Sequence, residues 1–319
     1  MKLLITGGCG FIGSNFIRHI LGKYRNYKVI NLDKLTYCGC MENLIDIKTD
    51  SRYKFVKGDI CDRKLIDKIA KDCDCIVNFA AESHVDRSIK DASCFVRTNV
   101  HGVHVLLDAA KKNKLNRFIH ISTDEVYGSI PKGSFKETSL LHPNSPYAAS
   151  KAAGDHLALA YYATFKVPVI VTRSSNNFGP YQFPEKVIPL FITNLLENKK
   201  VPLYGDGLNV RDWLYVLDNC KAIDIVLHKG RIGEIYNIGG GFEAPNIKLA
   251  CSILKYLNKP KKVIKYVSDR LGHDRRYSLD SAKIRQLGWI PIVDFNEAIK
   301  ETIEWYKNNK AWWKNKKQI

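Results

Sequence analysis

The strongest constraint on the fold is an alternation of short apolar runs with amphipathic helical segments through the first half of the 319-residue chain. The apolar runs expected to form strands are Lys2–Thr6, Lys28–Asp33, Tyr53–Gly58, Cys75–Ala81, Phe118–Ser122 and Val167–Thr172. These runs are too apolar for a sheet with one face in water, so helices must cover both faces. The alternation therefore predicts an α/β fold with a doubly wound parallel sheet.

This rhythm changes beyond about residue 175. Four prolines between residues 180 and 202 and the turn Gly205-Asp206-Gly207 replace the regular alternation. We therefore expect a first domain over residues 1–174 and a smaller mixed α/β C-terminal lobe over residues 175–319. No Ser- or Gly-rich linker divides them, and Tyr236-Asn237-Ile238-Gly239 is typical of a strand that returns to the first sheet.

A glycine-rich segment, Thr6–Gly13, follows the first expected strand and opens a helix. Glycines there permit a tight turn and let backbone amides approach a pyrophosphate at the helix N-terminus. A simple turn and cap would explain this motif alone. Asp33 strengthens it, because it ends the second strand twenty residues after Gly13, where a carboxylate can bind ribose hydroxyls. The pattern predicts a Rossmann-type dinucleotide-binding domain.

The same Asp33 carboxylate would repel a 2′-phosphate, which favours NAD over NADP as the cofactor. The neighbouring Lys34 argues in the other direction. Asp59, after the third strand, has two interpretations: it accepts a hydrogen bond from the adenine amine, or it caps the helix that begins near Asp62.

Tyr147 and Lys151 lie at positions i and i+4 of an expected helix and so share one face. A Lys ammonium beside a phenol favours the phenolate, and a bound nicotinamide cation would lower the phenol pKa further. The pair would then act as a base for an alcohol proton. A surface lysine beside a half-buried tyrosine is the alternative, and the glycine loop and Ser122-Thr123 upstream argue against it.

The segment Ser122–Tyr127 sets two carboxylates, Asp124 and Glu125, next to the Thr123 hydroxyl at the end of an expected strand. Two adjacent carboxyls raise the pKa of one of them, which suits one acid and one base. With a redox base nearby, the pair predicts elimination of water in addition to hydride transfer. The alternative is a polar turn in which Asp124 caps the next element and Glu125 faces solvent.

From these motifs the chain resembles the nucleoside-diphosphate-glucose 4,6-dehydratases of the extended short-chain dehydrogenase/reductase superfamily. The matching stretches run from the first residues to about residue 290: Gly7–Ser14, Asp33–Tyr37, Ala80–Ser88, Ser122–Gly128, Tyr147–Lys151, Ser175–Tyr181, Phe183–Lys186, Arg211–Val216 and Gly272–Tyr277. Two departures are Leu271, where the family often has proline, and a short loop after Gly128. They bear on nucleotide or partner preference.

The resemblance implies an enzyme that converts dTDP-glucose or UDP-glucose to the 4-keto-6-deoxy sugar nucleotide and water, in deoxysugar (rhamnose-type) biosynthesis. NAD is implied as a bound, regenerated cofactor. By the same resemblance Tyr147, next to Lys151, and Thr123 take the O4 proton, Glu125 takes the C5 proton, and Asp124 protonates the departing O6 hydroxyl. The hydride leaves C4 and returns to C6. The choice between thymine and uracil stays open.

The resemblance also implies two sets of binding residues. Those expected at the cofactor are Gly7, Gly10, Phe11, Ile12, Gly13, Asp33, Lys34, Thr36, Asp59, Ile60, Ala80, Ala81, Ser83, Thr98, Tyr147, Lys151 and Asn176. Those expected at the substrate are Ser83, His84, Thr123, Asp124, Glu125, Asn176, Glu185, Lys186, Arg211, Asn246, His273, Asp274, Arg275 and Tyr277.

Each of the polar substrate residues has a structural alternative. Arg211 could bind a pyrophosphate bidentately, or it could pair with Asp212, as Arg275 could with Asp274. A lone histidine such as His84 is more often a satisfied structural residue than a ligand.

Two rival functions remain. A 4-epimerase or decarboxylase of the same superfamily needs Tyr147 and Lys151 but not the Asp124-Glu125 pair. The net charge of +18 suggests a non-catalytic dinucleotide- or nucleic-acid-binding module. However, the lysines are dispersed and concentrate only near residues 259–265 and 307–317, so a solvated surface explains them and no nucleic-acid partner is expected.

Composition and the N-terminal segment bear on compartment and partners. No window approaches the ~20 apolar residues of a membrane helix, and the first apolar run is too short for a secretory signal. The nine cysteines show neither C-x-x-C nor zinc-ligand spacing, which indicates reduced thiols and no metal. We therefore expect a cytoplasmic enzyme, and the helices expected at Thr98–Lys112 and Pro146–Phe165 resemble the family's paired-helix homodimer interface.

Overall fold

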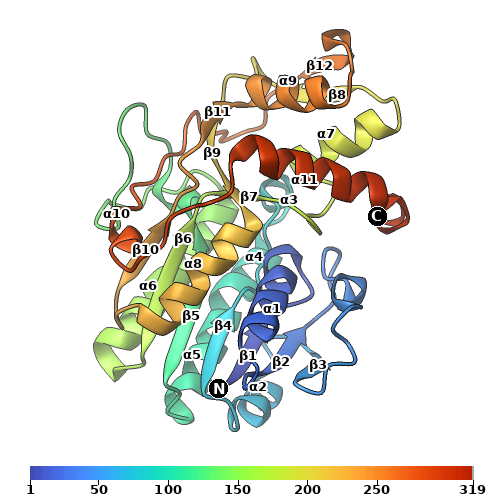
Figure 1. Cartoon of the computed structure of the whole chain (residues 1–319). Helices are drawn as coiled ribbons and strands as arrows, with labels where there is room; N and C mark the ends of the chain where they lie inside the picture. Colours follow the sequence, from blue (N-terminus) through green and yellow to red (C-terminus); the bar gives the residue numbers. More distant parts are fainter. Residues whose placement is uncertain (318–319) are drawn as a thin grey trace.

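The structure, a computed structural model, describes residues 1–317 and is built around a seven-stranded parallel sheet (Figure 1). The strand order is β10-β6-β5-β4-β1-β2-β3. The strands are β1 (Lys2–Thr6), β2 (Lys28–Asp33), β3 (Tyr53–Lys57), β4 (Cys75–Asn78), β5 (Arg117–Thr123), β6 (Val169–Ser174) and β10 (Ile235–Ile238). All six expected strands are present, and the expected return of residues 236–239 is confirmed by β10, which pairs with β6.

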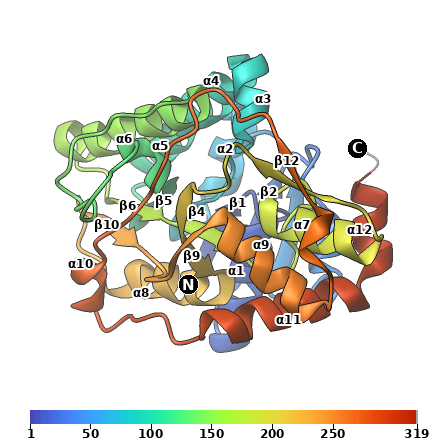
Figure 2. The same ribbon diagram turned by 90° about the horizontal axis from the view of Figure 1, so that it is seen from above.

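Helices cover both faces of this sheet, which explains why β1, β4, β5 and β6 are buried over almost their whole length (Figure 2). α1 (Phe11–Lys23) and α8 (Val216–Lys229) lie on one face. On the other lie α2 (Arg63–Ala70), α5 (Val103–Lys112) and α6 (Pro146–Phe165). The helix expected over Thr98–Lys112 begins as the π-helical turn η2 (Arg97–Gly102), which precedes α5.

Short elements fill the connections at the carboxyl ends of the strands. They are η1 (Met41–Leu44), α3 (Val85–Lys90), α4 (Ser93–Val96) and η3 (Asp124–Tyr127). The strand order reverses between β1 and β4, and parallel sheets bind ligands in the crevice at such a point.

A second group of elements lies beyond these carboxyl ends (Figure 1). Its two small sheets are formed by β7 (Asn176–Phe178), β9 (Val210–Tyr215) and β11 (Glu243–Pro245), and by β8 (Val201–Tyr204) and β12 (Ile264–Val267). Its helices are α7 (Val187–Leu196), α9 (Asn246–Tyr256), η4 (Lys261–Val263), α11 (Phe295–Asn308) and α12 (Lys310–Lys316), whereas α10 (Ala282–Arg285) packs against β10 of the large sheet. This mixed lobe matches the expected architecture, and the last two residues of the range expected for it lie outside the described residues.

The first domain is not a continuous segment of chain. α8 and β10 come from the second half of the sequence, yet α8 packs on α1 and β10 extends the large sheet. The boundary at residues 174 and 175 therefore stays a prediction. Within residues 1–317, no helix is both long and apolar enough to cross a bilayer, and no cluster of His, Cys, Asp or Glu could hold a metal ion.

Candidate active site

A cavity lies at the point where the strand order reverses, and the glycine-rich loop forms one wall of it. Gly7 has φ +70°, and a Cβ there would come within 2.6 Å of the Ala80 amide nitrogen. A Cβ on Gly13 would lie 2.4 Å from the Gly7 carbonyl oxygen. Side chains are therefore excluded at both positions, and β1, the loop and α1 pack closely.

The N-terminus of α1 fits an anionic group in this cavity. Its N-cap residue, Gly10, provides no side-chain hydrogen bond, and the first turn carries no acidic residue. The first amides of a helix have no intrahelical acceptor, so those of Phe11 and Ile12 are free to bind a pyrophosphate. Both residues line the cavity.

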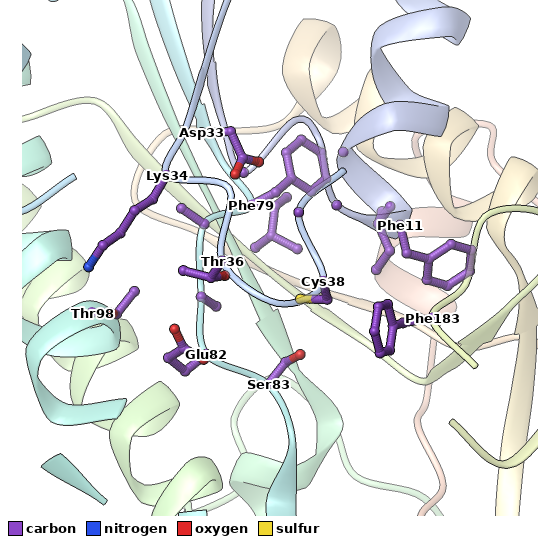
Figure 3. Close-up of a pocket in the computed structure, with 18 of the residues that line it drawn as sticks. Phe11, Asp33, Lys34, Thr36, Cys38, Phe79, Glu82, Ser83, Thr98 and Phe183 are labelled. Atoms are coloured by element: carbon purple, nitrogen blue, oxygen red, sulfur yellow. The ribbon is translucent and has the colours of Figure 1, made fainter. Parts of the chain in front are cut away.

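Asp33 lies at the end of β2 and borders the same cavity (Figure 3). Its carboxylate accepts hydrogen bonds from the Cys9 amide at 2.9 Å and the Leu35 amide at 2.8 Å. Lys34 pairs with Asp59 at 2.8 Å between Nζ and Oδ2, so its charge is already neutralised. Lys34 is therefore not a free positive charge that would favour the 2′-phosphate of NADP.

The capping interpretation of Asp59 is wrong. Asp62 caps α2 by accepting a hydrogen bond from the Leu65 amide, whereas Asp59 accepts from the Cys61 amide within the preceding turn. Asp59 lines the cavity, as the adenine interpretation requires.

Every residue expected at the cofactor lines this cavity except Asn176, which begins β7. Glu185 and Lys186, which we expected at the substrate, also line it. The lining residues that we did not predict are Leu32, Tyr37, Cys38, Gly39, Gly58, Phe79, Glu82, Ile121, Ser122, Tyr181, Gln182 and Phe183. Figure 3 shows Asp33, Thr36 and Cys38 along one bordering loop, with Phe11 and Phe183 on another side. Tyr37, Glu82, Ser122, Tyr181 and Phe183 lie within the stretches that carry the family resemblance, and most of the others lie directly beside such a stretch.

Tyr147 and Lys151 project from α6 into the same cavity and both are buried. The Lys151 ammonium donates to the Ile121 carbonyl at 2.6 Å. Burial lowers the pKa of Lys151 to about 8, and Asp155 opposes that change. Burial raises the pKa of Tyr147, the negative charge of Glu125 raises it further, and the Thr123 hydroxyl opposes the rise. Tyr147 is therefore a neutral phenol here and needs nearby positive charge to act as a base.

The carboxylate pair lies at the end of β5, in the short helix η3. Thr123 is the N-cap residue: its hydroxyl accepts from the Glu125 amide and lies 3.2 Å from Asp124 Oδ1. Asp124 is 2% exposed, and its Oδ2 has no hydrogen-bond partner. The polar-turn interpretation is therefore wrong for Asp124, which neither caps the element nor faces solvent.

The surroundings of the two carboxyls differ in charge. Burial raises the pKa of Asp124 well above its usual range, Glu125 and Asp212 add to the rise, and Arg211 opposes it. Burial also raises the pKa of Glu125, but three cations, Arg270, Arg211 and Lys186, oppose that rise. The site thus favours a neutral acid at Asp124 beside a carboxylate at Glu125, as acid and base chemistry requires.

Arg211 on β9 is a buried cation with no carboxylate in ion-pair range within residues 1–317. Its guanidinium donates to the carbonyls of Val210 and Asp274 and lies 4.3 Å from the centre of the Tyr277 ring. A buried charge without a partner is costly. Arg211 therefore suits an anionic ligand that supplies the missing charge.

The alternative ion pairs are wrong. Arg275 is exposed and pairs with Asp206 at 2.9 Å, not with Asp274. The Asp274 carboxylate instead accepts from Asn144 Nδ2 at 2.6 Å and from the Tyr277 hydroxyl at 2.7 Å. The structure thus brings Asp274 and Tyr277 to Arg211 and leaves the Arg275 side chain engaged elsewhere.

His84 caps α3, where Nδ1 accepts from the Arg87 amide, and its Nε2 lies 3.5 Å from Glu185. Burial lowers the pKa of His84 to about 4, so the ring is neutral. Lys186 donates to the Ser83 carbonyl at 3.0 Å. These contacts join α3 to the start of α7 and account structurally for His84.

The remaining expected substrate residues lie in the second lobe. Asn246 begins α9 and its Oδ1 is buried without a partner. His273 Nδ1 contacts Asp269 at 2.5 Å. Arg270, which we did not predict, provides the largest opposition to the raised pKa of Glu125.

Comparison with known proteins shows the family. Residues 4–302 match the GDP-mannose 4,6-dehydratase family. The dTDP-glucose 4,6-dehydratase of Streptomyces niveus is 54% identical over 98% of this chain and 95% of its own length. The solved dTDP-glucose 4,6-dehydratase of Streptomyces venezuelae, with NAD bound, has a TM-score of 0.97 at 51% identity, covering 99% of this chain and 100% of that one.

The fold alone does not separate dehydratases from epimerases. The UDP-glucuronic acid 4-epimerase of Bacillus cereus has a TM-score of 0.91, covering 97% of this chain and 99% of its own, but only 30% identity. The higher identity to the dehydratases, together with Asp124 and Glu125, discriminates between the two activities. The resemblance and the NAD cofactor predicted from the motifs are confirmed. This chain belongs to the GDP-mannose 4,6-dehydratase family, among its NAD-dependent nucleotide-sugar 4,6-dehydratases.

Proposed function

We propose that this enzyme converts dTDP-glucose, or UDP-glucose, to the corresponding 4-keto-6-deoxyglucose nucleotide and water, a step of rhamnose-type deoxysugar biosynthesis. The observation that carries the proposal is the buried Asp124 carboxyl beside Glu125 at the end of β5, because its Oδ2 has no hydrogen-bond partner. Tyr147 and Lys151 on α6 line the cofactor cavity. The names of the dehydratase relatives support it.

The first half of the reaction uses Tyr147, Lys151 and Thr123. The Lys151 ammonium stabilises the negative charge that forms on the Tyr147 oxygen when it takes the proton of the sugar C4 hydroxyl. Thr123 hydrogen bonds to the same sugar oxygen. The cavity lined by the glycine-rich loop and Asp33 would hold NAD, which would supply the acceptor for the C4 hydride and the donor of that hydride to C6.

The second half uses the carboxyl pair. Once C4 is a ketone, the C5 hydrogen is acidic enough for the Glu125 carboxylate to remove it. The electron pair left at C5 forms the C5–C6 double bond as the C6–O bond breaks. The proton of neutral Asp124 goes to the departing oxygen, so one water leaves. When C6 receives the hydride, Glu125 returns its proton to C5, which completes the 4-keto-6-deoxy sugar.

The second lobe holds the nucleoside diphosphate in this proposal. Arg211 binds the pyrophosphate, because it is a buried cation with no carboxylate in ion-pair range among the described residues. Lys186 is a second cation near Glu125. The other residues expected at the substrate are Ser83, His84, Asn176, Glu185, Asn246, His273, Asp274, Arg275 and Tyr277; for Arg275 the contact requires that its pair with Asp206 opens.

The test follows product mass with a glucose nucleotide and only catalytic NAD. We expect quantitative conversion to a product lighter by one water, with NAD unchanged at the end. An unchanged sugar, or an oxidised sugar with one equivalent of NADH, would contradict the dehydratase assignment. Running dTDP-glucose and UDP-glucose in parallel gives the kcat/KM ratio and identifies the nucleotide.

We further propose a homodimer formed by the outer faces of α5 and α6. The exposed positions of α6 include the small residues Ala149, Ala160 and Ala163, which let a second helix approach closely. Phe165 is exposed at the end of this helix. We expect the mass of two chains in solution at micromolar concentration, measured by light scattering, and a single-chain mass would contradict the dimer.

We also propose a cytoplasmic location. All nine cysteines are free thiols, and disulfides are rare in that compartment.

A further inference from the structure

A buried chain of polar contacts runs beneath the site and joins its two catalytic elements. Asp155 lies on α6, one turn after Lys151, and accepts a hydrogen bond from Arg173 Nε on β6 at 2.8 Å. Arg173 Nη1 donates to the Tyr127 hydroxyl at 2.7 Å. Tyr127 is the last residue of η3, two positions after Glu125. We call these three residues, Asp155, Arg173 and Tyr127, the Arg173 bridge.

The Arg173 bridge is closed to solvent. Asp155, Tyr127 and Arg173 are at most 2% exposed. The Tyr127 hydroxyl donates in turn to Asn237 Oδ1 on β10 at 2.8 Å. The Tyr127 ring stacks on Phe135 with a centroid distance of 4.9 Å. Water cannot compete for these contacts, so they fix distances more firmly than surface contacts would.

Stability alone is a weak explanation for the bridge. Burying an Arg–Asp pair costs desolvation energy, and apolar residues of similar volume are often equally stable in its place. A buried pair does specify one geometry, because its hydrogen bonds are satisfied in only one arrangement. The location of the bridge indicates which geometry: α6 carries Tyr147 and Lys151, and η3 carries Asp124 and Glu125.

We propose that Arg173 is a positioning residue that holds the elimination pair of η3 in register with the redox pair of α6. The proposal rests on the roles assigned under the proposed function. Both pairs must act in turn on one sugar that does not leave the site. A displacement of about 1 Å in a reacting group can cost about 10²-fold in rate. η3 has only four residues, so its attachment to Arg173 matters more than it would for a long helix.

Tyr127→Phe tests this with the smallest change. It removes one hydroxyl, keeps the ring on Phe135, and leaves the Arg173–Asp155 pair in place. In single turnovers, we expect C5 proton removal, measured as exchange with deuterated solvent, to slow by about tenfold or more, while C4 oxidation and KM stay within about twofold. In the protein without cofactor, amide hydrogen exchange of residues 124–128 should accelerate.

Tyr236→Phe is the matched control. Tyr236 is equally buried on β10, and its hydroxyl accepts from the Arg231 amide near the start of that strand, away from the site. It should change neither half-reaction nor exchange at residues 124–128. Equal effects of the two variants, equal slowing of both half-reactions in Tyr127→Phe, or unchanged C5 exchange would each overturn the proposal.

A second variant tests whether Arg173 acts through Tyr127. Arg173→Lys keeps the charge for Asp155 but lacks the rigid fork by which Nε reaches Asp155 while Nη1 reaches the Tyr127 hydroxyl. It should reproduce the slow C5 exchange in the wild-type background and add little to it in Tyr127→Phe, because the two changes share one contact. Additive losses would overturn the linkage. If the wild-type enzyme releases no water, the proposed function is contradicted instead. Amide hydrogen exchange of residues 124–128 in Tyr127→Phe would then still test whether the Arg173 bridge holds η3 in place.

Discussion

Glu125→Gln is expected to lower the rate of product formation by about 10²–10⁴-fold, the usual contribution of a general base. The amide cannot take the C5 proton, but it keeps the size of the side chain. C4 oxidation does not use Glu125 as a base, so the variant should still form NADH in amounts limited by the enzyme. Stopped-flow absorbance of the reduced cofactor, together with product mass, separates the two steps.

The pH profile gives this prediction a second readout. A base works only above its pKa, and burial raises that of Glu125, so the acidic limb of wild-type elimination should lie above the usual range of a glutamate. Glu125→Gln should lack this limb. The control is Glu234→Gln, a half-buried residue at the start of β10 that pairs with Lys283 at 2.6 Å, far from the cavity. Full turnover by Glu125→Gln would favour a 4-epimerase or decarboxylase.

The sheet and the cofactor loop could be predicted because their determinants are local. Apolar runs bounded by turns indicate buried strands wherever they occur, and a glycine loop between a strand and a helix has one common use. The observed strand ends differ from the expected ones by a few residues. β4, for example, stops at Asn78, whereas the expected strand ran to Ala81. The return of β10 was also visible, because its apolar run stands alone in an irregular region.

The charge state of the site could not be predicted in the same way. Two adjacent carboxyls suggest that one pKa is raised, but not which one. The structure decides this with residues from distant segments: Asp212 on β9 raises the pKa of Asp124, while Arg270 opposes the rise for Glu125. Only the folded chain brings them together.

The Arg173 bridge was equally hidden. Arg173 directly follows the strand expected over Val167–Thr172, and Asp155 lies within the helix expected over Pro146–Phe165. Neither residue belongs to a motif that marks catalysis. Their pairing needs β6 and α6 packed face to face, which local periodicity does not specify.

The contacts of Tyr147 make its hydroxyl separable from its packing. The ring meets Phe95 edge-on with centroids 6.3 Å apart, and this contact survives a change to phenylalanine. The backbone amide of Tyr147 donates a hydrogen bond to Ser88 Oγ, and this bond also stays in place when the side chain becomes phenylalanine. Removing the Tyr147 hydroxyl oxygen therefore tests its role as a base while the buried aromatic ring stays in place.

Tyr147→Phe is expected to lower kcat by about 10²–10⁴-fold and, unlike Glu125→Gln, to abolish both half-reactions together. Without the phenol no group takes the C4 hydroxyl proton, so no ketone forms and the C5 hydrogen is never acidified. Rapid-quench measurement should find neither reduced cofactor nor C5 exchange. Tyr161→Phe is the control on the same helix, since its hydroxyl donates to Asp108 at 2.7 Å on the outer side of α5. Near-normal C4 oxidation in Tyr147→Phe would transfer the role of base to another group, with Thr123 the nearest candidate.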